Sequence, residues 1–592
     1  MKSTVHLIAA ILLAVVVGLL TPLHSAAQQP AQQPAQQPEP PNVLARLELT
    51  DMSPRVVTVA SAPVLRVQGR VVNVGDRTIT DLAVRLQRDE PLISDEVATR
   101  AIQVIPEAPH VTRFQPVPGA LAPGQSSPFQ LEVALRGGAE LESLQITEPG
   151  VYPLLVNLNG KPDFGGTARL ASVPLLLPVL GIPPATAGEP PGPVLPRPAQ
   201  AMPLTVVWPL AGEPARLPSG PGEPILIRSD RSGTDPVATD IAAGGRLDGL
   251  LGALEQVVPP GSPLAAAVCV AIDPALVETV DAMSRGYRVS YPSGIGEGTG
   301  AADARRWLAR LRDAVQGRCV LPLPYADPDL VALSRAGLTD LEALAISTSA
   351  RLIGDLLEVQ PLTGVSWPAG AVLDERTLAD LTALGIHAVL LEPGSVSPAP
   401  ASAVVGLATT MPGSRGVAPT GLLVDPLLGS ALAAEVAQPG NDAVPVLSRP
   451  TGTASQLAAQ DGLGALVYRA ATDPDRSPVL LVPPRRWQAR GVEATALLST
   501  ARQLLEMGYF TPRELPALAS ASTEGPTTAV TYPPQAGAKE IPLTVTADIQ
   551  RARNILRDLQ VATVQDPTAA NLKPVELLDP LRLGLLRGVS SA

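Results

Sequence analysis

The first part of the chain carries short runs in which apolar and polar residues alternate. Residues 64–74 (VLRVQGRVVNV), 79–86, 129–135 and 151–158 have this period of two, and turn residues separate the runs. Such alternation is typical of strands with one face on a core and the other in water. About seven strands in about 140 residues predict an immunoglobulin-like β-sandwich for residues 43–180. The NVGD segment at 73–76 predicts a hairpin turn between two of these strands.

Beyond residue 202 the pattern changes to apolar β-branched runs that alternate with helix-length amphipathic segments. Two acidic residues followed by proline, Asp273-Pro274 and Asp327-Pro328, predict a helix cap with proline in the first turn. About seven β-α units in residues 203–515 predict a (β/α) barrel-like domain, with a doubly wound sheet as the alternative. The expected strands are 204–208, 264–272, 319–323, 363–367, 386–391, 421–424 and 479–482. The expected helices include 274–285, 301–315, 328–344, 374–384 and 492–507.

Two stretches resist regular structure and predict domain boundaries. Residues 181–202 are proline-rich and predict a semi-rigid linker. Residues 516–540, rich in Ser, Thr, Pro and Gly, predict a second linker. The remaining residues, 541–592, predict a short helical or mixed segment that ends without a stop-like element, so it leaves open a longer natural protein.

The N-terminus predicts export. Lys2 precedes an apolar run at residues 7–20, and Ser25-Ala26-Ala27 supplies small residues suited to signal peptidase. Because this run is short for a membrane span, we expect residues 1–27 to be a cleaved signal peptide. The QQPA repeats of residues 28–42 predict a disordered tether. The mature protein is therefore expected outside the cytoplasm, in the cell envelope or secreted.

The net charge bears on the possible partners, and the two cysteines bear on a possible disulfide. A formal net charge of -11 and a pI near 5.1 argue against a nucleic-acid partner, which would call for basic patches. Cys269 and Cys319 each lie in an apolar run, AAAVCVAID and RCVLPLPY, that predicts one of two successive parallel strands. Neighbouring strands bring cysteines within disulfide reach, so we predict a bridge, with two buried thiols as the alternative.

Four carboxylates follow predicted strands at the end where a parallel barrel places its active site. They are Asp273, Asp327, Glu392 and Asp425. Two of them at a suitable separation could hydrolyse a glycosidic bond as acid and as base or nucleophile. The alternative makes Asp273 and Asp327 helix caps and leaves Glu392 and Asp425 on a solvated rim.

Aromatic and cationic residues at the same strand ends are candidates for ligand contact. Their rings could stack on a sugar or could close the mouth of the barrel, and the arginine could meet a phosphate or carboxylate or lie in a solvated loop. These candidates are Trp208, Tyr325, Trp367, Arg485 and Trp487.

Histidine is too scarce for a zinc enzyme. The chain has four histidines, and only His387 falls in the barrel-like region, at the start of a predicted strand. A site built on several imidazoles cannot form there, and a Ser-His-Asp triad would find its histidine at the wrong end. We therefore predict no metal and no cofactor.

The order of these parts resembles a known family. A signal peptide, then LELTDMSPRVVTVASAPVLRVQGRVVNVGDRTITDLAVRL, then VSWPAGAVLDERTLADLTALGIHAVLL looks like a family of large exported actinobacterial proteins of unknown function, and the resemblance covers essentially the whole chain. Its members are encoded beside the MurJ-type lipid II flippase and usually continue into another β-domain and a membrane helix. The resemblance implies membrane anchoring only if the natural chain continues past residue 592.

The WPAGAVLD segment is also faintly similar to polysaccharide-deacetylase and glycosidase barrels. Such deacetylases need one Asp and two His as metal ligands in an early motif, and no such set occurs here. The leading hypothesis is a non-catalytic envelope protein, a scaffold or glycan-binding accessory whose partners are cell-wall glycan or envelope proteins such as the flippase. The alternatives are a metal-independent glycoside hydrolase and a pure spacer with a sealed mouth.

Overall fold

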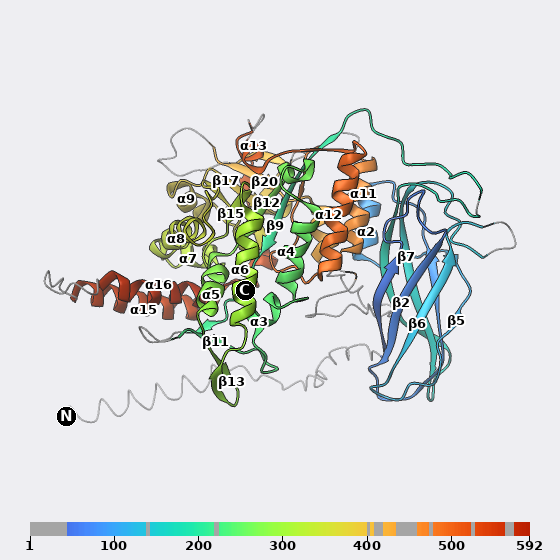
Figure 1. The fold of residues 1–592 in the computed structure, drawn as a ribbon, viewed down its shortest axis with the longest axis horizontal. Helices are drawn as coiled ribbons and strands as arrows, with labels where there is room; N and C mark the ends of the chain where they lie inside the picture. Colours follow the sequence, from blue (N-terminus) through green and yellow to red (C-terminus); the bar gives the residue numbers. More distant parts are fainter. Residues whose placement is uncertain are drawn as a thin grey trace, which may run out of the picture. The chain divides into compact units, whose positions relative to one another are not determined.

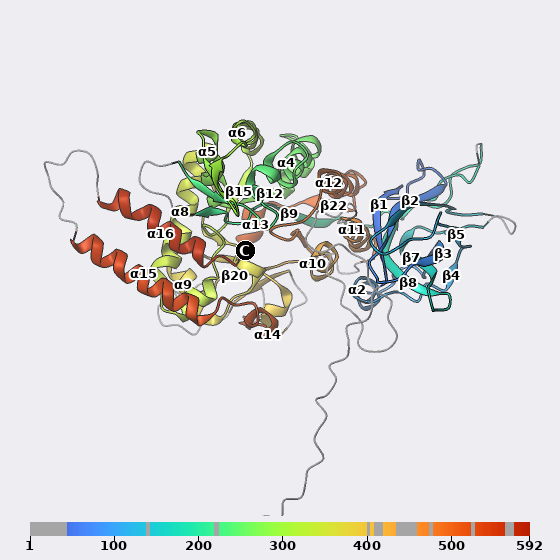
Figure 2. The same ribbon diagram turned by 90° about the horizontal axis from the view of Figure 1, so that it is seen from below.

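This computed structural model describes most of the chain after residue 43 (Figures 1 and 2). The described residues are 44–137, 142–186, 188–217, 224–398, 403–407, 418–433, 457, 459–472, 477–521, 527–562 and 574–591. The predicted signal peptide (1–27) and tether (28–42) lie outside them.

The N-terminal part, here called the β-domain, consists of two antiparallel sheets over one apolar core. The first sheet has the order β1-β2-β6 (Ala45–Ser53, Val64–Asn73, Ser126–Ala134). The second has the order β4-β3-β7-β8 (His110–Val111, Ile79–Arg88, Gly150–Pro162, Ala168–Val179), with β5 (Gln115–Pro116) also paired to β3. Inward side chains from both sheets, such as Val67 and Val156, share the core, as the period of two predicts.

The predicted hairpin at residues 73–76 is wrong. β2 and β3 belong to different sheets, so this turn carries the chain from one sheet to the other. Asn73 is fully buried, and its amide nitrogen donates to the carbonyls of Arg77 (2.8 Å) and Leu121 (2.7 Å). Its amide oxygen accepts from the N–H of Gly75 (3.0 Å). The side chain thus satisfies backbone groups that a hairpin ladder would have paired.

The second part, here called the α/β domain, contains seven strands that follow one another in chain order. Parallel ladders join β15-β12-β9-β21 and β16-β17-β20. One backbone hydrogen bond joins the two ladders on each side. The N–H of Leu362 donates to the carbonyl of Val320 (2.7 Å), and the N–H of Asp425 donates to the carbonyl of Leu480 (3.1 Å). The seven strands therefore follow one another in a closed ring, in which the last strand, β21, pairs with the first, β9. The strands are β9 (Met202–Leu210), β12 (Val268–Ile272), β15 (Cys319–Pro322), β16 (Val365–Ser366), β17 (Ala388–Leu391), β20 (Thr420–Leu423) and β21 (Val479–Leu481).

Alternate side chains of these strands meet in one apolar interior, here called the strand interior. The intervening side chains, such as Val206 and Val389, pack in separate clusters with the helices. Cys269 and Cys319 are opposite each other on β12 and β15, and they form a disulfide with a Cα–Cα distance of 4.6 Å. Members of the strand interior include Val207, Cys269, Ala271, Leu321, Val365, Leu390, Leu422 and Leu480.

Helices surround these strands (Figure 2). The segment predicted as one helix over 328–344 is instead two helices, because Gly337 between them adopts a left-handed φ of 69°. The helices of this domain are α3 (Pro236–Ile241), α4 (Arg246–Val257), α5 (Pro274–Ser284), α6 (Ala301–Val315), α7 (Leu330–Arg335), α8 (Thr339–Leu357), α9 (Glu375–Ala383), α10 (Pro426–Ala433), α11 (Gln460–Thr472), α12 (Gly491–Glu506) and α13 (Leu515–Ala519). Smaller strands are β10 (Arg216–Leu217), β11 (Leu226–Arg228), β13 (Arg288–Tyr291), β14 (Gly294–Glu297), β18 (Val396–Ser397), β19 (Val404–Gly406) and β22 (Phe510–Pro512).

The C-terminal part packs onto the α/β domain. β23 (Ala529–Val530) pairs with β18, and α14 (Pro534–Gly537) follows it. α15 (Leu543–Ala562) and α16 (Pro574–Gly588) lie side by side in both views (Figures 1 and 2). Within the described ranges, no helix is both long and apolar enough to cross a bilayer.

One apolar cluster, separate from the core between the two sheets of the β-domain, spans the junction of the β-domain and the α/β domain. Ala98 of α2 (Asp95–Gln103) and Leu176 of β8 belong to the same cluster as Leu463 of α11. Polar contacts accompany it: the Asp461 carboxylate accepts from the N–H of Leu176 (2.9 Å), and Arg55 forms an ion pair with Glu493 of α12. Residues 43–592 accordingly form one compact unit.

We predict that Arg55→Met destabilises the protein by about 3 kcal/mol, because it leaves the fully buried Glu493 carboxylate without its cation. Denaturant unfolding measures the change. The matched control is Arg66→Met, whose partner Glu132 and own side chain are both exposed, and which should cost less than about 1 kcal/mol. Equal effects of the two substitutions would contradict a buried interdomain ion pair.

Removing the disulfide by the double substitution Cys269→Ala and Cys319→Ala should lower the free energy of unfolding by about 4 kcal/mol. The bridge closes a loop with a sequence separation of 50 residues, which sets this size in the chain-entropy description. Unfolding of the variant and of the oxidised parent under the same conditions gives the difference. A loss below about 1 kcal/mol would show that the bridge does not restrict the unfolded chain.

Candidate functional site

The C-terminal ends of the strands carry most of the candidate residues. Loops after β12, β15, β16, β17, β20 and β21 hold Asp273, Asp327, Trp367, Glu392, Asp425 and Arg485. Loops at this end of parallel strands are where ligands of such folds usually bind. Packing side chains fill its centre, and a pocket lies to one side.

The centre is filled by four residues, here called the Arg485 cluster: Asp273, Asp327, Trp367 and Arg485. The Arg485 guanidinium lies over the Trp367 ring, with Cζ 4.6 Å from the ring centroid. It forms an ion pair with Asp327 and donates to the carbonyl oxygens of Trp367 (2.5 Å) and Pro368 (2.7 Å). The Arg485 side chain is 9% exposed, and this burial lowers its pKa to about 9 although Asp273 opposes the shift.

Asp273 combines two roles in this cluster. It caps α5, as predicted, by accepting from the N–H of Ala275 (2.9 Å). The same oxygen accepts from the N–H of Ala326 (3.4 Å), at the start of the loop where Ala326 and Asp327 both have positive φ. Burial raises the pKa of Asp273 to about 6, and the N–H donors and Arg485 only partly offset it.

The prediction that Asp327 caps a helix is wrong. Asp329 is the cap of α7, and it accepts from the N–H of Ala332 (2.9 Å). Asp327 instead has a left-handed backbone, and its carboxylate points to Arg485. Its carbonyl accepts from the backbone N–H and hydroxyl of Ser591, so the C-terminal segment is tied to the same loop.

Asp425 is also held by structural contacts. It caps α10 through the N–H groups of Leu427 (3.0 Å) and Leu428 (2.9 Å), and it accepts from Arg469 (2.8 Å). Arg469 in turn donates to Asp95 of α2 (2.7 Å), so this carboxylate takes part in holding the β-domain. Burial raises the pKa of Asp425, and Arg469 opposes the shift.

The remaining aromatic candidates are packed away from solvent. Trp208 is buried on the outer side of β9, where its indole N–H donates to the carbonyl of Leu250 (3.2 Å) and its ring meets Trp487 edge to face at 5.9 Å. Tyr325 is fully buried and donates to Glu278 (2.6 Å) while accepting from Arg587 (2.6 Å). A ligand would reach these rings only after neighbouring elements moved apart.

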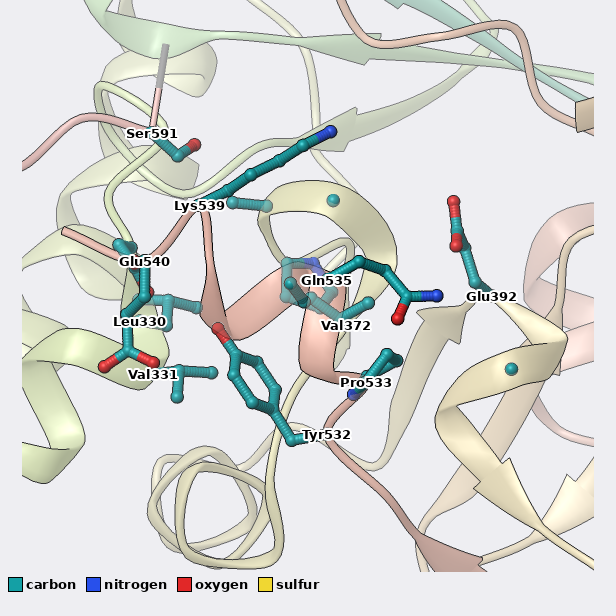
Figure 3. Close-up of a pocket in the computed structure, with 16 residues that line it drawn as sticks. Leu330, Val331, Val372, Glu392, Tyr532, Pro533, Gln535, Lys539, Glu540 and Ser591 are labelled. Atoms are coloured by element: carbon teal, nitrogen blue, oxygen red, sulfur yellow. The ribbon is translucent and has the colours of Figure 1, made fainter. Parts of the chain in front are cut away.

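A pocket of about 330 Å³ lies beside the Arg485 cluster, at the ends of β15, β16 and β17 (Figure 3). Its floor is apolar, with Leu330, Val331 and Val372. Of the four predicted carboxylates, Glu392 is the one that lines it. Glu392 has an exposed surface, yet the pocket wall removes enough water to raise its pKa, an effect that Lys539 counteracts.

The other wall is built by residues 532–540. The Arg335 guanidinium lies over the Tyr532 ring at 4.7 Å and donates to Glu540 (2.6 Å) and Asp374 (3.0 Å). The second oxygen of Asp329 accepts from the N–H of Ile541 (3.0 Å). These contacts hold the segment that carries Tyr532, Gln535 and Lys539 against the α/β domain.

Sequence reasoning missed this wall because Ser, Thr, Pro and Gly dominate residues 516–540, which predicts a linker. The signals that could have found it are the aromatic Tyr532 before two prolines and Lys539, one of only four lysines in the chain. Across the described part of the chain, no group of three or more His, Cys, Asp or Glu residues is placed to hold a metal ion.

Comparison with known proteins identifies a family but no activity. The profile described as "Family of unknown function (DUF6049)" matches residues 1–568. No curated protein matches the chain.

Solved structures share only weak similarity. The alpha-amylase AmyC from Thermotoga maritima has a TM-score of 0.40 and 10% identity, and covers 66% of this chain and 92% of its own. The 4-alpha-glucanotransferase from Thermococcus litoralis has a TM-score of 0.34 and 11% identity, over 61% and 48%. A beta-glucosidase from Listeria innocua in complex with glucose has a TM-score of 0.15 and 18% identity over 23% of this chain, which spans 16% of that enzyme. Scores of this size carry no argument about chemistry.

Asp273→Asn should make the variant progressively more stable relative to the parent as pH rises from 4 to 7. Because the folded pKa, about 6, lies above the ordinary value of 3.8, the carboxylic acid contributes stability at low pH that is lost as pH rises through 6. The asparagine oxygen still accepts both N–H groups and does not ionise. The difference in unfolding free energy should change by about 3 kcal/mol over this range, measured by denaturant unfolding at several pH values. A difference that is constant with pH would contradict the raised pKa.

Proposed function

We propose, from the premise that this chain belongs to the DUF6049 family of unknown function, that it is a non-catalytic, exported cell-envelope protein that serves as a scaffold or glycan-binding accessory. Cell-wall glycan or envelope proteins, such as a lipid II flippase, are the proposed partners. The proposal includes an immunoglobulin-like class for the β-domain and a (β/α) barrel-like class for the α/β domain.

The observation that carries this proposal is the filled centre of the strand ends. Arg485 and Trp367 occupy the place where a barrel enzyme would admit its substrate, and Asp273 and Asp327 neutralise the buried cation. Asp425 is engaged by Arg469 and two backbone donors. Three of the four candidate carboxylates thus have structural partners and little exposed surface, which favours an architectural role.

The join between the two domains supports a scaffold further. A shared apolar core and buried polar contacts hold the β-domain to α11 and α12, so a partner bound by either domain would be held in a fixed orientation to the other. Export is supported by the predicted signal peptide of residues 1–27 and by the disulfide, which suits an oxidising compartment.

A second candidate, a metal-independent glycoside hydrolase, rests on Glu392. This side chain lines the open pocket, and its raised pKa suits a proton donor. Such chemistry needs a second carboxylate across the bond to be cleaved. The two other carboxylates of the pocket, Asp329 and Glu540, are bonded to backbone N–H groups and to Arg335 respectively, which disfavours this candidate.

The two functions are separated by parallel assays on the purified protein. We expect it to sediment with isolated cell-wall glycan, or to crosslink to envelope membrane proteins, without releasing reducing ends from that glycan. Protein that does neither would remove the support for a scaffold. Glycan cleavage that Glu392→Gln abolishes, while the control Glu297→Gln at an exposed site does not, would establish the hydrolase instead.

A further inference from the structure

We propose that the pocket between Glu392 and Lys539 binds a small zwitterion: a free α-amino acid, or a group that carries an ammonium and a carboxylate on one carbon. The proposal goes beyond the function proposed above, because a scaffold needs no small-molecule site. It rests on two opposite charges that face one cavity.

The two charges act on each other only through space, since Lys539 partly offsets the raised pKa of Glu392. Within the ranges that the structure describes, Glu392 and Lys539 line the same pocket, and neither side chain has a hydrogen-bond or ion-pair partner. In Figure 3 the ends of Lys539, Gln535 and Glu392 surround one part of the pocket. A ligand ammonium could reach the carboxylate while the ligand carboxylate reaches Lys539, and Gln535 could donate to or accept from either group.

The other charges of the pocket are already neutralised. Glu540 points away from Lys539 and Glu392 in Figure 3 and pairs with Arg335 at 2.6 Å. Asp329 accepts from the backbone N–H groups of Ala332 and Ile541. The charged groups of the pocket that remain for a ligand are therefore one carboxylate and one ammonium. A ligand with a single charge could pair with only one of them.

The size and floor of the pocket set the class of side chain. A volume of about 330 Å³ lies at the small end of the usual range for ligand sites. In Figure 3 Val372 lies beside Gln535, while Leu330 and Val331 add apolar surface farther along the pocket, near Glu540. The pocket thus suits an amino acid with a small apolar side chain, such as alanine.

Titration calorimetry with glycine, L-alanine and D-alanine tests the proposal. The comparison ligands are N-acetylalanine, which lacks the ammonium, alaninamide, which lacks the carboxylate, and glucose, which is neutral. We expect at least one amino acid to bind at least about tenfold more tightly than all three. If no amino acid binds at millimolar concentration, or if glucose binds as tightly, the zwitterion site is refuted. Glucose binding would at the same time leave the glycan-binding form of the proposed function standing.

Single variants assign each charge. Glu392→Gln should weaken alanine binding about tenfold and abolish the preference for alanine over N-acetylalanine. Lys539→Gln should weaken alanine binding by a similar factor and abolish the preference for alanine over alaninamide. Matched controls are Glu297→Gln and Lys161→Gln, whose side chains are exposed outside the pocket. Melting temperatures should change little, because each variant loses only the through-space attraction between two exposed charges, Glu392 and Lys539. Alanine binding that both pocket variants retain at full strength would overturn the assignment.

Discussion

The desolvated guanidinium of Arg485 is the constraint on which the chemistry of this protein depends. A buried cation is costly unless carboxylates and carbonyls surround it. The chain supplies Asp327, Asp273 and two backbone carbonyls, and it places the Trp367 ring against the guanidinium face. Those groups come from the loops after three different strands. Two of the four carboxylates that sequence reasoning considered for catalysis, Asp273 and Asp327, thus neutralise Arg485.

Filling the centre moves the accessible cavity to one side. The pocket beside Pro368 exists because residues 532–540 form its outer wall. The Arg335 guanidinium donates to Glu540 and the Asp329 carboxylate accepts from the N–H of Ile541, and these two contacts hold the wall in place. Segments more than one hundred positions apart in sequence therefore build the walls of one small site. Its free charges, on Glu392 and Lys539, come from opposite walls. A site of this kind forms only after the C-terminal part has packed onto the α/β domain.

The sequence pattern predicted those features of the fold that depend on residues close together in the chain. Alternation located strands such as β2 and β6, and the Asp-Pro pair at Asp273 located the start of α5, because period and capping involve neighbours in sequence. The predictions of a hairpin at residues 73–76 and of a helix cap at Asp327 were wrong because a residue far away in sequence determines each local structure. Asn73 is engaged by the carbonyl of Leu121, and Asp327 by Arg485. Composition also hid the pocket wall, since Ser, Thr, Pro and Gly around Tyr532 and Lys539 are typical of a linker.

The apolar cluster at the junction of the two domains resists their separation. Because Ala98 and Leu176 pack with Leu463, the two domains cannot separate without exposing apolar surface and the buried Glu493. Asp425 adds a polar link, since Arg469 joins it to Asp95 of the β-domain. That carboxylate follows β20, at the same end of the strands as the Arg485 cluster. The contacts from Asp425 through Arg469 to Asp95 therefore connect the strand ends directly with the β-domain.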